Sequence, residues 1–328
     1  MPVINVVQAV RDALAEEMRA DPSVMVLGED VGLRGGVFRA TEGLLEEFGE
    51  LRVMDTPIAE SAIVGVAIGA ALNGMRPVAE IQFADFIHSA VDQIVNEAAK
   101  IRYRSRGDFG CPIVVRAPYG GGVRGALYHS QSVEALFYNV PGLKIVAPST
   151  PYDVKGLLKA SIRDPDPVLF FEHKRTYRLI RGEVPDHDYV VPLGKAALRR
   201  RGGDVTVISY GLMVHLAMEA AEALAAEEGI EAEVIDLRTL RPLDEEAILE
   251  SVRKTGKVLI VHEANKVGGV GAEIAALIAE QALFYLDAPI ARLTPPESPA
   301  APFNRVLEDA YFPTAADIRR AIADLARF

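Results

Sequence analysis

Several kinds of residue and segment are scarce in this 328-residue chain. A single cysteine, Cys111, excludes a disulfide within the chain and fits a reducing compartment, so we expect a cytoplasmic protein, or a mitochondrial-matrix protein in a eukaryote. The most apolar run, residues 62–72, is far shorter than the ~20 residues that span a bilayer, so we expect no membrane partner. The net charge of −11 argues against nucleic acid as a partner.

Motifs of several common enzyme classes are also missing. The sequence has no P-loop, no His-Glu-x-x-His, no paired cysteines and no Gly-x-Ser-x-Gly, which leaves P-loop, zinc and serine-hydrolase chemistry without support. Residues 120–125 match Gly-x-Gly-x-x-Gly, but residues 126–129 do not open an amphipathic helix, and no acidic residue stands about twenty positions on. We therefore predict a loop over a site instead of a dinucleotide-binding turn.

The composition is that of a globular protein of roughly two domains, because half of the residues are hydrophobic and a quarter are charged. Short β-rich runs alternate with longer helical patterns, which predicts an α/β fold with parallel sheets. The predicted strands are 24–27, 77–83, 113–116, 143–147, 168–171, 205–209, 232–237, 257–262 and 290–293. The predicted helices are an amphipathic one from about residue 6 to 18, then 57–72, 88–103, 151–163, 212–228, 244–254 and 270–285.

A change in composition marks the predicted domain boundary. Residues 177–204 are rich in arginine, glycine and proline and have weak periodicity. We predict a first domain over residues 1–180, a linker over 181–203 and a second domain over 204–328.

The stretch from Asp55 to Ser61 admits two interpretations. Thr56 is a plausible N-cap and Pro57 fits the first helical position, which would place Glu60 in the first turn, where the helix dipole favours a carboxylate. This structural interpretation is complete in itself. A catalytic role for Glu60 is the alternative.

Two further stretches carry candidate site residues. The run from Glu80 through Gln82 to Phe86 reads as a strand that ends in an aromatic, and Phe86 is either core or a platform for a ligand. His129 lies in a polar stretch after the glycine-rich loop and not on an apolar face, so a proton-transfer role competes evenly with a structural one.

Taken together, these stretches resemble the β subunit of the thiamine-diphosphate-dependent decarboxylase component of 2-oxoacid dehydrogenase complexes. The matching segments run over most of the chain: VMVLGEDVG, RVMDTPIAES, RPVAEIQFADF, GGGVRGALYHSQS, PGLKIVAPSTPYDVKGLLKASIRDPDPV, VIDLRTLRPLD and GGVGAEIA. The segment around His129 is somewhat more similar to the branched-chain members than to the pyruvate members.

The resemblance implies a pyrimidine-binding domain followed by a transketolase-type C-terminal domain. It also implies an α2β2 heterotetramer that holds thiamine diphosphate between unlike subunits. Glu60 would contact the pyrimidine N1′, Phe86 would pack against the pyrimidine ring, and Glu29 and Gln82 would be further cofactor-binding residues. His129 would face the 2-oxoacid substrate and the incoming lipoyl group. A carboxylate that shares a proton with N1′ helps the cofactor to lose its reactive C–H proton.

One half of such a site is missing from the sequence. Members of this type hold the diphosphate through Mg²⁺ with a Gly-Asp-Gly motif, which this chain lacks. We therefore expect the α subunit to hold the Mg²⁺ and this chain to be inactive alone. The resemblance adds the lipoyl domain and the subunit-binding domain of a dihydrolipoyl acyltransferase as partners.

The resemblance also suggests a monovalent-cation site, with K⁺ as the candidate ion. Backbone oxygens near Ile113 and Ile162 would form it, with Asp164 and Asp166 beside them. A plain turn is the competing interpretation, because aspartate and proline are common turn formers.

Two other functions remain open at this point. The chain could be the C-terminal subunit of a split transketolase, although the segment around His129 does not look like the transketolase one. It could also be a non-catalytic α/β interaction subunit, although Glu60, Phe86 and His129 together argue for retained chemistry.

Overall fold

The computed structural model describes all of residues 1–328 and divides them into two compact units. The first unit contains residues 1–119 and 136–193, and the second contains residues 120–135 and 194–328. The sequence did not predict that residues 120–135 group with the second unit.

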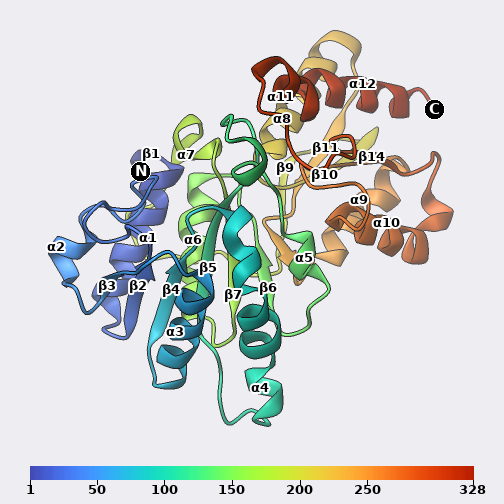
Figure 1. The fold of residues 1–328 in the computed structure, drawn as a ribbon. Coiled ribbons are helices and arrows are strands. Elements are labelled where there is room, and N and C mark those ends of the chain that lie inside the picture. Colours follow the sequence, from blue (N-terminus) through green and yellow to red (C-terminus); the bar gives the residue numbers. More distant parts are fainter. The chain divides into compact units, whose positions relative to one another are not determined.

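The first unit is built on a parallel sheet (Figure 1). Its strands lie in the order β6-β7-β5-β4-β2-β3, and every pair among them is parallel. The strands are β2 (Val24–Gly28), β3 (Val53–Asp55), β4 (Arg76–Glu80), β5 (Val114–Tyr119), β6 (Lys144–Val146) and β7 (Val168–His173). A small antiparallel pair, β1 (Val3–Asn5) with β8 (Arg181–Glu183), lies apart from this sheet.

Helices α1 (Val6–Ala20) and α6 (Pro151–Arg163) pack together and share one hydrophobic cluster with the sheet. The sequence explains where both helices begin. Asn5 and Gln8 form a capping box at α1, and Thr150 caps α6 with proline in its first turn. The remaining helices of the unit are α2 (Leu44–Phe48), α3 (Glu60–Leu72), α4 (Ile101–Arg104), α5 (Ala135–Tyr138) and α7 (Thr176–Leu179).

The predicted helix over residues 88–103 is wrong as a regular α-helix. The structure has instead the 3₁₀ helix η1 (Ala84–Ala90), the π-helix η2 (Gln93–Glu97), the 3₁₀ turn η3 (Ala98–Lys100) and the short α4. The apolar spacing that suggested one helix survives in buried Ile87, Ala90 and Ile94, but the winding changes along it. π-turns inside helices often accompany functional sites.

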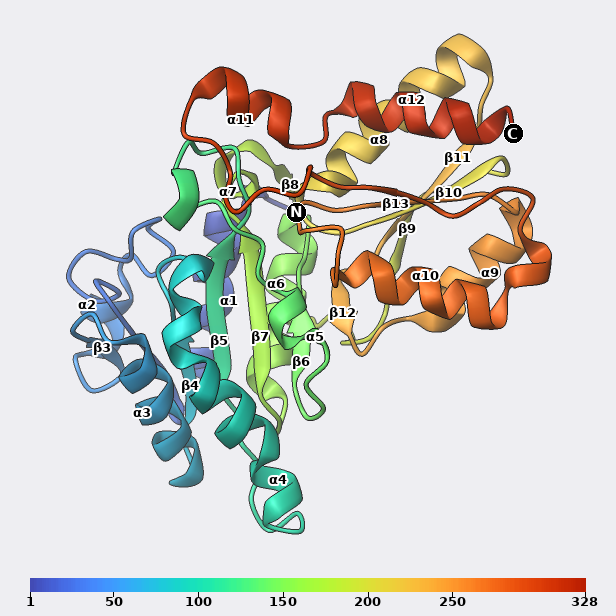
Figure 2. The ribbon, with the colours of Figure 1, turned by 45° about the vertical axis from the view of Figure 1, so that its right-hand side comes forward.

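The second unit has a five-stranded sheet in the order β14-β13-β10-β11-β9 (Figure 2). These are β9 (Ala197–Arg200), β10 (Val205–Ser209), β11 (Ala232–Asp236), β13 (Val258–Val261) and β14 (Ala291–Leu293), with β9 antiparallel to β11 and the other pairs parallel. Helices α8 (Leu212–Glu228) and α12 (Ala315–Ala326) cover one face, and α9 (Glu245–Thr255) and α10 (Val270–Gln281) cover the other. The unit also contains η4 (Ala126–Tyr128), β12 (Thr239–Arg241), η5 (Leu283–Tyr285) and α11 (Arg305–Tyr311).

The predicted α/β class with parallel sheets is confirmed, and every predicted strand has a counterpart. Helices α6 and α8 have the predicted bounds. The short strands β1, β3, β8, β9 and β12 were missed, because three or four residues carry too little periodicity to read. None of the helices is both long and apolar enough to cross a lipid bilayer.

Candidate functional site

Four of the predicted site residues lie where the strands of the first sheet end. Glu29 follows β2, Glu60 opens α3 after β3, and Gln82 and Phe86 follow β4. Since parallel strands end at the same edge of a sheet, the segments that follow them meet there, at the position where α/β proteins bind ligands. The structure thus brings these four residues together within the first unit.

Glu29 and Glu60 form a pair of carboxylates without a cationic partner. Glu29 is 8% exposed, and burial, followed by the charges of Glu60 and Asp30, raises its pKa above the usual value. No lysine or arginine forms an ion pair with either Glu29 or Glu60. A buried acid whose pKa is raised by burial and by a neighbouring carboxylate is typical of functional sites.

Glu60 owes its position to the start of α3. The helix begins at Glu60, with Ala59 as an N-cap that makes no side-chain hydrogen bond. The prediction that Thr56 caps the helix and Pro57 opens it is therefore wrong, although Glu60 does lie in the first turn. The Ser89 hydroxyl of η1 has two acceptors for its one proton, Glu60 Oε2 and the Phe86 carbonyl, each at 3.2 Å, and this links Glu60 to the helix that carries Phe86.

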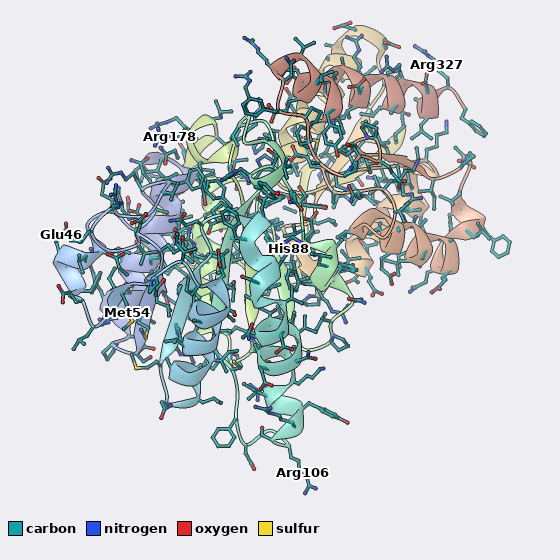
Figure 3. All side chains as sticks on the ribbon, in the orientation of Figure 1. Glu46, Met54, His88, Arg106, Arg178 and Arg327 are labelled. Carbon is teal, nitrogen blue, oxygen red and sulfur yellow. The ribbon has the colours of Figure 1, made fainter.

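Phe86 belongs to a row of aromatic rings beside the carboxylates. Its ring meets Phe83 edge-on with 6.0 Å between centroids, and Phe83 meets Phe38 edge-on at 5.5 Å. Phe86 is half-buried, so part of its ring is available to a ligand. His88, labelled in Figure 3, lies on the same short helix and binds the Asp85 carbonyl through Nδ1 at 2.9 Å.

The loop after β2 is held close to the sheet edge. The Asp55 carboxylate accepts the amides of Gly32 at 2.6 Å and Leu33 at 3.1 Å. Gly28 has φ +157°, and a Cβ there would lie 2.7 Å from the Glu80 carbonyl oxygen, so only glycine permits this approach. Gln82 Nε2 lies 3.5 Å from the Glu29 carbonyl oxygen, so Gln82 borders this loop.

A buried ionic layer under this edge was not predicted from the sequence. Arg116 on β5 donates to both oxygens of Glu172 on β7 and to Glu80 on β4, each at 2.6 Å, and Tyr177 donates to Glu172 at 2.5 Å. Burial alone would lower the pKa of Arg116, but the charges of Glu172 and Glu80 outweigh it and raise that pKa. The layer ties three adjacent strands together directly beneath the site. Only the pairing register, which the sequence does not reveal, could have shown it.

His129 belongs to the second unit. It follows η4, and its Nδ1 lies 3.2 Å from the Gly125 carbonyl. Gly125 has no room for a side chain, because a Cβ there would lie 2.3 Å from His129 Cβ. The glycine-rich residues 120–125 form no helix, as predicted.

The proposed cation-binding oxygens already have protein partners. The Ile113 carbonyl accepts the Val168 amide at 3.0 Å. The Arg76 guanidinium donates to the carbonyls of Ile162 at 2.8 Å and Asp164 at 3.2 Å.

The two aspartates of that loop are paired as well. Lys144 Nζ contacts the Asp164 carboxylate at 2.6 and 2.7 Å, and Arg102 pairs with Asp166. The chain's own cations therefore neutralise this loop, and a monovalent ion here stays a prediction. No group of three or more His, Cys, Asp or Glu side chains could hold a metal ion elsewhere in the chain.

Comparisons with known proteins cover both units. Residues 3–180 match the family described as transketolase, pyrimidine binding domain, and residues 194–318 match the transketolase C-terminal domain. The chain is 63% identical over 328 residues to the 2-oxoisovalerate dehydrogenase subunit beta of Bacillus subtilis, covering 100% of both. It is 47% identical over 328 residues to the pyruvate dehydrogenase E1 component subunit beta of the same organism, again covering 100% of both.

A solved structure has the same fold over almost the whole chain. It is described as a split gene transketolase, inactive beta4 tetramer, and aligns with a TM-score of 0.80 over 99% of this chain and 98% of the other. Its sequence identity is 26%, well below that of the two dehydrogenase subunits.

Proposed function

Because the chain belongs to the β subunits of the thiamine-dependent 2-oxoacid dehydrogenases, we propose that it acts with an α subunit on a branched-chain 2-oxoacid. The pair would release CO2 and pass the acyl group to a lipoyl group of an acyltransferase. The observation that carries this proposal is the pair Glu29 and Glu60, which lies without a cation at the carboxyl edge of the pyrimidine-binding sheet.

The residues at this edge fit the pyrimidine half of thiamine diphosphate. Glu60, partly exposed in the first turn of α3, can hold a proton against a ring nitrogen, and Phe86 offers a half-buried face for stacking. Burial and the charges of Glu60 and Asp30 raise the pKa of Glu29, so its ionised form is less favoured here than in water. When bound, the cofactor supplies the nucleophilic carbon and the electron sink that decarboxylation requires.

Glu60 would carry the proton transfer of this half-site. A carboxylate in that position could hold or release a proton at a bound ring nitrogen, and Ser89 holds its Oε2 from the side of η1. The ionic layer of Arg116 under the edge keeps β4, β5 and β7 in register, so the carboxylate and the aromatic row keep their spacing.

The phosphate half would come from the α subunit. The sequence lacks Gly-Asp-Gly, and no acidic cluster in the chain could hold a metal ion, so we infer that Mg²⁺ is bound by the partner in an α2β2 heterotetramer. The lipoyl domain and subunit-binding domain of a dihydrolipoyl acyltransferase would be the further partners. His129, on its half-buried segment, would meet the 2-oxoacid and the lipoyl group.

The branched-chain substrate is favoured over pyruvate by similarity. Identity to the 2-oxoisovalerate dehydrogenase subunit is 63%, against 47% for the pyruvate dehydrogenase subunit over the same length. The split-transketolase alternative has only the 26% identity of a shared fold behind it.

Co-purification followed by a substrate panel tests the proposal. Tagged chain should capture a partner that bears Gly-Asp-Gly, and the complex should decarboxylate 2-oxoisovalerate faster than pyruvate. The free chain serves as the control and should be inactive. Ketol transfer between sugar phosphates without 2-oxoacid turnover would instead establish the transketolase alternative.

A further inference from the structure

The second unit has a topological switch point between β10 and β13. β10 leads through α8 to β11 on one side, whereas β13 leads through α10 to β14 on the other side. In open α/β sheets, ligands bind just beyond the carboxyl ends of the strands at such a point. Here Tyr210 follows β10, and His262 and Glu263 follow β13, all of them buried.

The chain's own segment 120–135 lies at this switch point. In sequence it follows β5 of the first sheet, yet it groups with the second unit. Near its start, the Gly121 amide donates to Glu263 Oε2 at 3.2 Å. Near its end, the Tyr210 hydroxyl donates to Glu134 Oε1 at 2.5 Å. Both ends of the segment are thus bound to residues that directly follow the two central strands.

Further contacts hold the first half of the segment. Glu308 Oε1 on α11 accepts the amides of Gly122 and Arg124, each at 3.1 Å. The Phe312 ring packs so closely on Gly121 that a Cβ there would lie 2.0 Å from it. The Gly120 amide donates to the Gln131 carbonyl at 3.0 Å, which closes the segment into a compact loop around His129.

The second half of the segment contains the buried acid Glu134. This side chain is fully buried, and no lysine or arginine pairs with it. Burial raises its pKa to about 7, with the Tyr210 hydrogen bond acting against that shift and the Glu263 charge adding to it. An acid buried in this way disfavours folding compared with an apolar side chain, and what it contributes here is the directional bond to Tyr210.

We propose that Glu134 and Tyr210 are positioning residues that hold the His129-bearing segment against the carboxyl edge of the second sheet. The segment thereby occupies the place where other open α/β sheets bind a ligand. The inference rests on the proposed function, because only there is His129 the residue that meets the substrate and the lipoyl group.

Amide hydrogen exchange in the assembled α2β2 complex tests the positioning directly. Tyr210→Phe removes only the hydroxyl, and Glu134→Leu removes the acceptor, so each should speed exchange over residues 120–135 by about fivefold to tenfold. Glu134→Gln keeps an acceptor oxygen and should stay within about twofold of the parent protein. Tyr285→Phe, the same change at a half-exposed tyrosine of this unit, is the matched control.

Activity provides the second readout. In Tyr210→Phe and Glu134→Leu, acyl transfer to the lipoyl domain should fall by about the factor by which amide exchange speeds up. Exchange of the C2 proton on the thiazolium ring of bound thiamine (C2–H exchange) should stay at the parent rate. Unchanged amide exchange in Tyr210→Phe would overturn the proposal, as would a Glu134→Gln variant that is as impaired as Glu134→Leu. If the complex turns over no 2-oxoacid at all, the proposed function fails, and amide exchange still decides whether the pair holds the segment.

Discussion

At the scale of the residue, two acids stand out because neither is paired with a cation. Glu29 lies beside Glu60 at the edge of the first sheet, and Glu134 is buried near the end of the His129-bearing segment of the second unit. In both places the pKa is raised, and burial is the largest cause. Glu60, the neighbour of Glu29, and Glu134 each lead to a prediction that a purely structural role would not make.

Glu60→Gln separates the two interpretations of the first-turn acid. Glutamine keeps the size and the bond to Ser89 but cannot take up a proton. As a helix-start residue alone, Glu60 would contribute a few tenths of a kcal/mol through the dipole, and turnover would not change. As the proton-holding group, its loss should slow C2–H exchange of bound thiamine in the complex by about 10²–10⁴-fold.

The control for Glu60→Gln is His129→Ala. That change should impair the steps at the substrate or lipoyl group while C2–H exchange stays fast. Melting temperature and assembly should barely change in either variant. Fast C2–H exchange in Glu60→Gln would contradict the catalytic interpretation and leave Glu60 with a structural role only.

Glu134 predicts how stability depends on pH. Its usual pKa is 4.5 and burial raises it to about 7, so the folded chain retains a proton that the unfolded chain loses in that range. The free energy of unfolding should therefore fall by ~3 kcal/mol as pH rises from about 4.5 to 7. Above pH 7 this contribution should level off. Glu134→Gln should remove this part of the pH dependence.

Paired denaturant titrations check the Glu134 prediction, with the parent complex and Glu134→Gln compared at each pH. Taking the difference between them cancels the groups that titrate alike in both proteins. His262, which stacks on Tyr210, does not contribute in this window, because burial lowers its pKa to about 4. A constant difference from pH 5 to 8 would contradict the prediction.

At the scale of the element, the sequence predicted the long helices and buried strands well. α6 and α8 kept their bounds because caps and apolar spacing agree along them. It failed over residues 84–104, where one apolar stripe is wound as 3₁₀, π and α in turn. Winding depends on packing against α3 and the sheet, which no local pattern encodes.

The candidate site shows the same contrast between features set by local sequence and features set by packing. Glu60, Phe86 and Glu29, which the resemblance assigns to the site, do lie next to strand ends, and their roles stay predictions. The ionic layer of Arg116 and the Glu134–Tyr210 pair were not found, because each joins residues far apart in sequence through strand register or unit boundaries.

α3 carries a row of small residues, and its glycines predict a subunit contact. A Cβ at Gly69 would meet nothing within 4 Å, so packing within the chain does not require glycine there. Glycine inside a helix costs ~1 kcal/mol relative to alanine. We expect Gly69→Leu to prevent tetramer assembly while helical circular dichroism is retained, and Gly69→Ala to assemble normally.

Sedimentation of the two Gly69 variants with the α subunit present measures this outcome. Gly65→Leu is a second probe, because a Cβ at Gly65 would have room within the chain: its nearest neighbour, Gln93 Cγ, would lie 4.0 Å away, an ordinary van der Waals contact. A full tetramer formed by Gly69→Leu would contradict the assignment of this face to the interface.

The loop from Ile162 to Asp166 is where we predict a bound monovalent cation. Arg76 and Lys144 already serve its carbonyl and carboxylate oxygens, so K⁺ would have to bind to their remaining lone pairs. If it does, the melting temperature and the affinity for thiamine diphosphate should be higher in potassium than in tetramethylammonium at equal ionic strength. Identical values in the two salts would show that no potassium ion binds there and that Arg76 and Lys144 alone neutralise the loop.

At the scale of the whole molecule, we expect charge and the end of the chain to affect docking of the acyltransferase. The chain carries a net charge of −11, and a basic subunit-binding domain would be attracted to it over a distance set by salt. α12 extends to Ala326, whose carbonyl accepts from Lys257 at 2.9 Å, and Arg327 pairs with Glu228 at 2.6 Å. Phe328, at the end of the chain, is 73% exposed.

Deletion of Arg327 and Phe328 tests whether this end takes part in docking. The deletion removes one exposed ion pair, which contributes at most about 1 kcal/mol, so the fold should be retained. Binding of the acyltransferase subunit-binding domain should weaken, and the loss should persist at high salt because the ring contributes apolar area and not charge. Decarboxylation with an artificial electron acceptor should stay at the parent rate. Equal loss of docking and decarboxylation would mean a folding defect, and unchanged docking would exclude this end of the chain from the contact.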